Sequence, residues 1–171
     1  MTDASAFVLD GAAIADEVLD RVAEEARALI LGGVTPGLAV VRFDKGELPE
    51  VPELAPGGLV RSTTRPVPLC GRNLPLSDAL FEHDALCFLD CKSRSLAFID
   101  ASGASITMEY ESFQHAALWT RPGAPFLCLE AWTGYSDPDG FTGDLFDKPS
   151  MRVLEPGGSA RHQARFVFRP E

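Results

Sequence analysis

The first apolar pattern in the chain has the period of a helix. Between residues 11 and 31, apolar side chains recur every four positions and charged side chains occupy the other faces. Asp10 can cap the free amides of the first turn, and Gly32 with Gly33 supplies a C-terminal stop. We therefore predict one N-terminal α-helix, with its apolar face formed by Ile14, Val18, Val22, Ala26 and Ile30.

After this helix the pattern changes to that of short strands. Residues 38–43 predict a first strand, and the Pro and Gly residues that follow argue against further helix. Apolar or alternating runs predict strands at 85–89, 95–99, 106–110, 125–131 and 164–168, with turn residues between them. The pattern therefore predicts a mainly β fold, an antiparallel β-sandwich with one N-terminal α-helix.

Composition narrows the classes of partner. The chain has 171 residues, of which 46% are hydrophobic, so it can bury a core. Its formal net charge of −10 disfavours nucleic acid and anionic membranes and leaves neutral polar ligands such as sugars open. No apolar run approaches the roughly 20 residues that span a bilayer, and the N-terminus lacks a signal-peptide pattern. We expect a cytoplasmic protein.

The four cysteines suggest core packing rather than metal binding. Cys87 and Cys91 are predicted to lie on one face of a strand, too far apart to share one ion easily. No second Cys/His pair has matching spacing. We predict buried thiols, with neither metal nor cofactor.

The sequence changes character near residue 40. Residues 7–41 resemble the N-terminus of methylenetetrahydrofolate dehydrogenase/cyclohydrolase, and the match is carried by residues 9–11, 13–15 and 33–41. The Tyr and Lys that follow in that family are absent here, so no folate activity is implied. We therefore predict two segments, residues 1–40 and residues 41–171.

The second segment is similar to another family. Residues 41–171 resemble the C-terminal half of aldose 1-epimerase, a galactose mutarotase-like protein, through residues 64–81, 84–95, 118–134, and 143–148 with 154–157. The resemblance implies part of a galactose mutarotase-like supersandwich. It also implies a hexose as ligand and the interconversion of its α and β anomers by ring opening.

The resemblance places the catalytic base at Glu130. In such a reaction a base takes the proton of the anomeric hydroxyl and an acid protonates the ring oxygen. Glu130 lies inside an otherwise apolar run, where a carboxylate is costly to bury unless it is paired or used. The alternative is a carboxylate at a strand end that faces water.

Three further residues are candidates for sugar contacts. The resemblance places an acidic residue before the strand at 85–89, which is Asp84, with Glu82 as an alternative alignment. Trp132 and Trp119 could stack on a sugar face, or could belong to the core.

The family's general acid is a His in the N-terminal half of the enzyme. None of His83, His115 and His162 matches it, and we expect each in a surface or core position. The chain is thus expected to be an incomplete, weakly active or inactive epimerase. The alternatives are a non-catalytic carbohydrate-binding protein and a structural remnant, chimeric with a folate-enzyme fragment.

An incomplete sandwich would expose sheet edges and an apolar face. Such surfaces favour self-association when they are left uncovered. We therefore expect either that the N-terminal helix covers the sheet or that the chain forms a homodimer through it.

Overall fold

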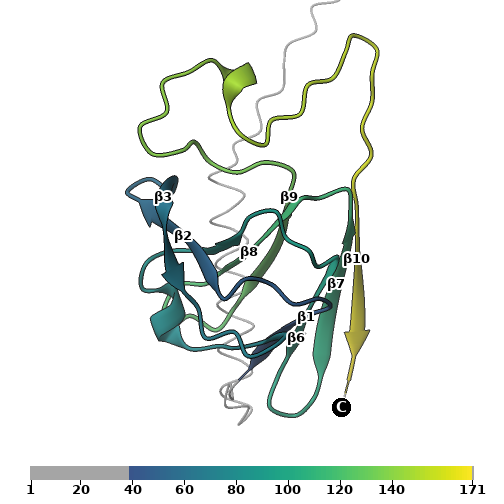
Figure 1. The fold of residues 1–171 in the computed structure, drawn as a ribbon. Helices are drawn as coiled ribbons and strands as arrows, with labels where there is room; N and C mark the ends of the chain where they lie inside the picture. The colour runs from purple at the N-terminus through teal and green to yellow at the C-terminus, as the bar shows by residue number, and fades with distance from the viewer. Residues whose placement is uncertain (1–38, 171) are drawn as a thin grey trace, which may run out of the picture. The chain divides into compact units, whose positions relative to one another are not determined.

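The computed structural model of the protein describes residues 39–170 (Figure 1). The predicted helix at 11–31 and nearly all of the folate-enzyme-like segment lie outside these residues. The described part begins next to its first strand, β1 (Val40–Phe43), so Val40 and Val41 belong to the β-structure. No helix among the described residues is long and apolar enough to cross a membrane.

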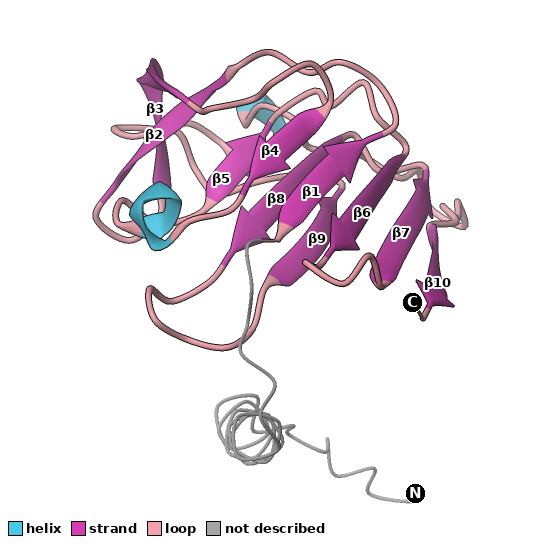
Figure 2. Ribbon diagram, turned by 90° about the horizontal axis from the view of Figure 1, so that it is seen from below, coloured by secondary structure: helices cyan, strands magenta, loops and turns pink. Residues whose placement is uncertain are grey.

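Five strands form the larger sheet, in the order β10-β7-β6-β1-β4. All neighbours are antiparallel, with β1 at an inner position between β6 and β4. Figure 2 shows the sheet with β10 at one edge. The other strands are β4 (Asn73–Pro75), β6 (Ser95–Ile99), β7 (Ser105–Glu111) and β10 (Gln163–Arg169).

A second, smaller sheet has the order β5-β8-β9 and is also antiparallel. Its strands are β5 (Leu86–Phe88), β8 (His115–Trp119) and β9 (Cys128–Trp132). A hairpin of β2 (Glu50–Ala55) and β3 (Leu59–Pro66) forms a separate two-stranded ribbon.

Two short 3₁₀ helices complete the secondary structure. They are η1 (Asp78–Phe81), which precedes β5, and η2 (Leu145–Asp147), in the long segment before β10.

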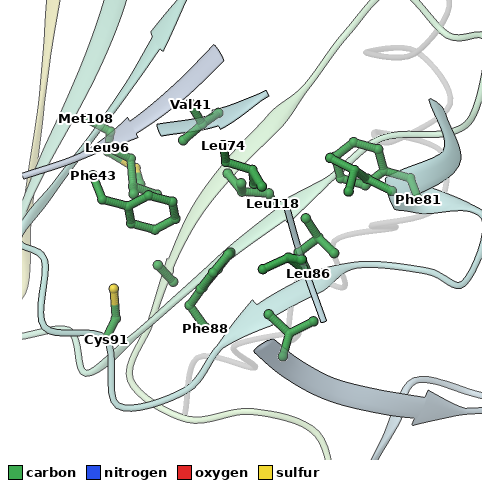
Figure 3. Close-up of a cluster of buried hydrophobic side chains, with 14 of the residues drawn as sticks. Val41, Phe43, Leu74, Phe81, Leu86, Phe88, Cys91, Leu96, Met108 and Leu118 are labelled. Atoms are coloured by element: carbon green, nitrogen blue, oxygen red, sulfur yellow. The ribbon is translucent and has the colours of Figure 1, made fainter. Parts of the chain in front are cut away.

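The core lies between the five-stranded and three-stranded sheets, because alternate residues of each strand point inward. Phe43 of β1 and Phe88 of β5 meet edge to face, with ring centroids 4.8 Å apart (Figure 3). Buried residues from both sheets form one cluster, which includes Val41, Phe43, Leu74, Leu86, Phe88, Leu96, Met108, Tyr110, Ala116 and Leu118. The prediction of an antiparallel β-sandwich is confirmed.

Several predicted strands appear with small changes in their bounds. The strand predicted at 95–99 is β6, and those at 106–110 and 164–168 are β7 and β10, each extended at its ends. The strand predicted at 125–131 begins only at Cys128. Pro125 lacks the N–H that a strand ladder needs, so a later start is the physical expectation.

One face of the larger sheet is not fully covered at its β10 edge. Phe166 pairs with Met108 and Phe168 pairs with Ile106, so these four side chains share the face that carries the core. Met108 is buried, whereas Phe166 and Phe168 are 51% and 70% exposed. The three-stranded sheet is narrower than the five-stranded sheet, so it does not cover the β10 edge of the larger sheet.

Candidate functional site

The outward face of the three-stranded sheet carries Glu130. A row of paired residues crosses this sheet, from Cys87 on β5 to Ala117 on β8 and Glu130 on β9. Ala85, Cys87 and Ala117 are buried and small, so they form a low floor beside the carboxylate. The opposite faces of the same strands carry Leu86, Leu118 and Leu129 into the core, which fixes Glu130 on the outer side.

A pocket of about 280 Å³ lies over this floor. All four residues singled out in the sequence line it, namely Glu130, Asp84, Trp119 and Trp132. The remaining lining residues are Leu54, Gly57, Gly58, Ala85, Cys87 and Ser136. The fold therefore brings together residues that are up to 82 positions apart in the sequence, from Leu54 to Ser136.

The indole of Trp132 holds the Glu130 carboxylate. Trp132 Nε1 donates to Glu130 Oε2 at 2.8 Å. The two residues are two positions apart on β9, so their side chains lie on the same face. Within residues 39–170 this is the one hydrogen bond to the carboxylate, which leaves Glu130 Oε1 open to a ligand hydroxyl. Glu130 is half-buried. Its exposure therefore lies between the two alternatives from the sequence, a buried carboxylate and a carboxylate at a strand end that faces water.

Asp84 forms the exposed rim of the pocket. Its backbone has a positive φ of 73°, and its Oδ1 accepts a hydrogen bond from the amide of Ala85 at 2.8 Å. The turn therefore fixes the carboxylate just before β5 begins. Glu82, the alternative candidate, is exposed and does not line the pocket.

Trp119 lies further along β8 and packs against Phe126, with ring centroids 5.7 Å apart. It pairs in register with Cys128. Both tryptophans also pack against the small cluster of the pocket floor. They therefore combine the two roles that the sequence left as alternatives, core packing and pocket lining.

The pocket floor is electrically negative. Burial, together with the nearby Asp84 and Glu130 carboxylates, raises the pKa of the Cys87 thiol to about 12, and Arg65 opposes this rise only in part. Burial also raises the pKa of Cys128, again with a contribution from Glu130. Both thiols are therefore protonated near neutral pH, and Cys87 does not act as a nucleophile in this pocket.

Cys87 and Cys91 do not share a face, contrary to the sequence prediction. β5 ends at Phe88 and the chain turns at Asp90, which has a positive φ of 51°. Cys87 therefore faces the pocket floor, whereas Cys91 packs in the main core beside Tyr110, with Sγ and Oη 3.5 Å apart. Among residues 39–170, no group of three or more His, Cys, Asp or Glu side chains could hold a metal ion.

None of the described histidines lines the pocket. His83 is exposed, and His162 is exposed and bonded through Nδ1 to the carbonyl of Ser112. His115 is buried on β8, on the same outward face as Ala117, and is 1% exposed. These positions are the surface and core positions expected from the sequence. His162 directly precedes β10.

The sequence did not identify two walls of the pocket. The turn of the β2–β3 hairpin supplies Gly57 and Gly58, both at positive φ. The segment after β9 supplies Ser136, whose hydroxyl donates to the carbonyl of Gly58 and so joins the two walls. The Gly-Gly pair is a visible turn signal, but nothing in the sequence shows where that turn lies relative to β9.

Comparison with known proteins adds one relationship. No protein-family model matches the sequence, and no curated protein matches it. Among solved structures, the chain is similar to a galactose mutarotase-like protein from Lactobacillus casei, with a TM-score of 0.66 and 18% sequence identity. The match covers 77% of this chain and 46% of that one, so the present chain spans about half the length of that protein.

No comparison shows the folate-enzyme resemblance of the N-terminal segment, which stays a prediction. At 18% sequence identity, the structural match supports a shared fold alone. The antiparallel sheets described above therefore form a galactose mutarotase-like fold.

Proposed function

We propose that the Glu130 pocket binds the anomeric end of a neutral hexose, in an aldose 1-epimerase-like protein. The observation that carries this proposal is the convergence of Glu130, Asp84, Trp119 and Trp132 on one pocket. Two carboxylates offer acceptors for sugar hydroxyls, and two indole rings offer apolar faces for the C–H surface of a pyranose. These are the complementary features of a neutral, hydroxyl-rich ring.

Size and charge narrow the ligand class. The pocket volume of about 280 Å³ suits a small ligand, because pockets for drug-sized molecules span about 300–1,000 Å³. Asp84 and Glu130 would repel a phosphate or a second carboxylate. We therefore expect glucose and galactose to bind more tightly than glucose 6-phosphate or glucuronate.

In the proposed reaction, Glu130 is the base. Its free oxygen, Oε1, would accept the proton of the anomeric hydroxyl, while the Trp132 indole keeps Oε2 in place. The ring oxygen needs a proton from an acid, and none of the described pocket residues is a histidine. An acid contributes roughly 100- to 10,000-fold to such a reaction. Turnover by this pocket alone is therefore expected to be slow.

The same geometry supports a second candidate, carbohydrate binding without turnover. The polar groups that would hold the sugar are in place, whereas no histidine stands among them to protonate the ring oxygen. The protein would then keep the sugar-binding function of the fold and lack its catalysis.

Two measurements separate these functions. Calorimetric titration with D-glucose and D-galactose tests binding, and polarimetry of freshly dissolved α-D-glucose tests turnover. Glu130→Gln should abolish any rate increase and weaken binding. Glu111→Gln, an equal change of charge at an exposed site on β7, should change neither. Absence of binding heat for every neutral hexose would exclude both functions.

A further inference from the structure

His115 is a buried residue with polar partners, beside the Glu130 pocket. Its Nδ1 accepts a hydrogen bond from the backbone amide of Asp90 at 2.9 Å, and its Nε2 contacts the hydroxyl of Ser150. The edge of its ring meets Tyr135, with ring centroids 5.1 Å apart. His115 also pairs in register with Trp132, the residue that holds Glu130.

The cluster has the composition of a Ser-His-Asp triad but not its proton arrangement. A backbone amide can only donate, so Nδ1 must be the unprotonated nitrogen and Nε2 must carry the proton. Nε2 therefore donates to Ser150 and cannot remove the proton of its hydroxyl. The Asp90 carboxylate lies 3.9 Å from Nδ1, beyond hydrogen-bond distance, and its side chain is 91% exposed.

The contacts of this cluster converge on residues 133–136, the segment that contributes Ser136 to the pocket. The hydroxyl of Ser150 lies 3.3 Å from the carbonyl of Thr133 and 3.4 Å from the side-chain oxygen of Gln114. Tyr135 packs on the His115 ring, and the next residue is Ser136, the pocket-lining residue that bonds to Gly58. His115 thus anchors residues 133–136 from the inside of the protein.

We propose that neutral His115 is a positioning residue that holds residues 133–136 as a wall of the pocket, and that its protonation releases this wall. The effect on sugar affinity rests on the proposed function, whereas the release of the segment does not. An imidazolium ring has two N–H donors, so Nδ1 could no longer accept from the Asp90 amide. Protonation would place two donors against each other in a buried site.

The charges around the ring set the direction of the pH dependence. Burial lowers the pKa of His115 from its ordinary value of 6.5, and the Asp90 carboxylate opposes this only in part. On β9, Glu130 lies diagonally across the ladder, about 7–8 Å away. Ser150, Gln114 and Tyr135 complete the contacts. The unfolded chain therefore takes up the proton first, so the stability due to neutral His115 is complete above pH 6.5 and declines as the pH falls below it.

Hydrogen exchange tests the release without any sugar. After correction for intrinsic rates, exchange of residues 133–150 should accelerate when the pH is lowered from about 7.5 to about 5.5. His115→Gln keeps an amide donor and cannot titrate, so hydrogen exchange in this variant should not accelerate when the pH is lowered. His162→Gln removes an exposed histidine, and its exchange should accelerate at the lower pH as in the wild type. The proposal would be overturned if exchange in the wild type did not accelerate at the lower pH, or if it accelerated equally in His115→Gln.

A second variant makes the test independent of the folding of His115→Gln. Ser150→Ala removes the partner of Nε2 and should exchange rapidly in residues 133–150 already at the higher pH. Slow, wild-type exchange in this variant would also count against the proposal.

Sugar titrations over the same pH range then give the functional readout. Wild-type affinity for D-galactose should fall about tenfold at the lower pH, the loss expected from one well-placed hydrogen bond in the pocket. His115→Gln should bind with a pH-independent Kd. If no hexose binds at the higher pH, the proposed function fails, and the hydrogen-exchange result still decides the role of His115.

Discussion

At the scale of single residues, one hydrogen bond determines how Glu130 is presented. Trp132→Phe keeps an aromatic ring beside Glu130 and removes only the Nε1–H that fixes Oε2. Because the carboxylate is half-buried, the loss should be about 1 kcal/mol, or about fivefold in hexose affinity. Calorimetry measures the change.

Trp119→Phe is the matched control for this prediction. Trp119 lines the same pocket, but it packs against Phe126 and is not bonded to Glu130. It should therefore affect affinity through contact area alone. The indole–carboxylate bond would have no special role if hexose affinity fell equally in both variants. The same would hold if removing the sugar's anomeric hydroxyl changed the affinity of both variants equally.

The thiols supply a second prediction at this scale. Cys70 is exposed, whereas burial raises the pKa of Cys87 to about 12 and that of Cys91 to about 11. Since the thiolate is the reactive form, a disulfide reagent at about pH 8 should modify Cys70 rapidly and the two buried thiols only on unfolding. Cys70→Ser should remove the fast phase. A fast reaction at Cys87 in the folded protein would mean that the pocket floor is open to the reagent.

The residues of the site were only partly predictable. Glu130, Asp84 and the tryptophans carry chemistry that a resemblance can transfer to a numbered position. Leu54, Gly57 and Ser136 do not, because they line the pocket through contacts between segments far apart in the sequence. Cys91 shows the same limit, since one turn at Asp90 was enough to move it into a different cluster.

At the scale of elements, β10 is the least protected strand. It forms one edge of the five-stranded sheet, and Phe166 and Phe168 are exposed on its core-side face. An open edge with apolar side chains favours self-association. A homodimer is one of the two alternatives expected from the sequence, and we propose β10 as the site through which it would form.

Replacing Phe166 and Phe168 together by Ser tests this surface. The double variant should shift the sedimentation coefficient toward that of a monomer, because it removes the apolar contact while leaving the strand backbone intact. Phe146→Ser, at an equally exposed position on η2, should leave self-association unchanged. A wild-type protein that sediments as a monomer at all concentrations would contradict the assignment.

Strands with a clear alternation were predictable, and those interrupted by proline were not. β7 alternates between less and more exposed positions along most of its length, whereas β6 was predictable as a short, mostly apolar run. β2 contains Pro52 and β3 ends at Pro66, so the region from 44 to 75 predicted only turns and short segments. These strands form an isolated two-stranded ribbon, where a missing N–H is tolerated more easily than in the middle of a sheet.

At the scale of the whole molecule, the described residues place the Glu130 pocket on the outside of a β-sandwich. The inward faces of β5, β8 and β9 build the core, and their outward faces carry the floor, the base candidate and both tryptophans. The chain spans about half of the galactose mutarotase-like protein that it resembles in fold. On the proposed function, the described residues would supply the groups that bind the sugar, and turnover would need a proton donor in addition.

The most direct test of the account uses the two indole N–H signals in a proton–nitrogen correlation spectrum. The chain has two tryptophans, and Trp119→Phe assigns the signals. Addition of D-galactose should shift the Trp132 signal saturably, because its Nε1–H donates to the carboxylate that we propose as the sugar ligand. In Glu130→Gln the shift should be much smaller. If neither indole signal moves at saturating concentrations of any neutral hexose, the Glu130 pocket is not a sugar site.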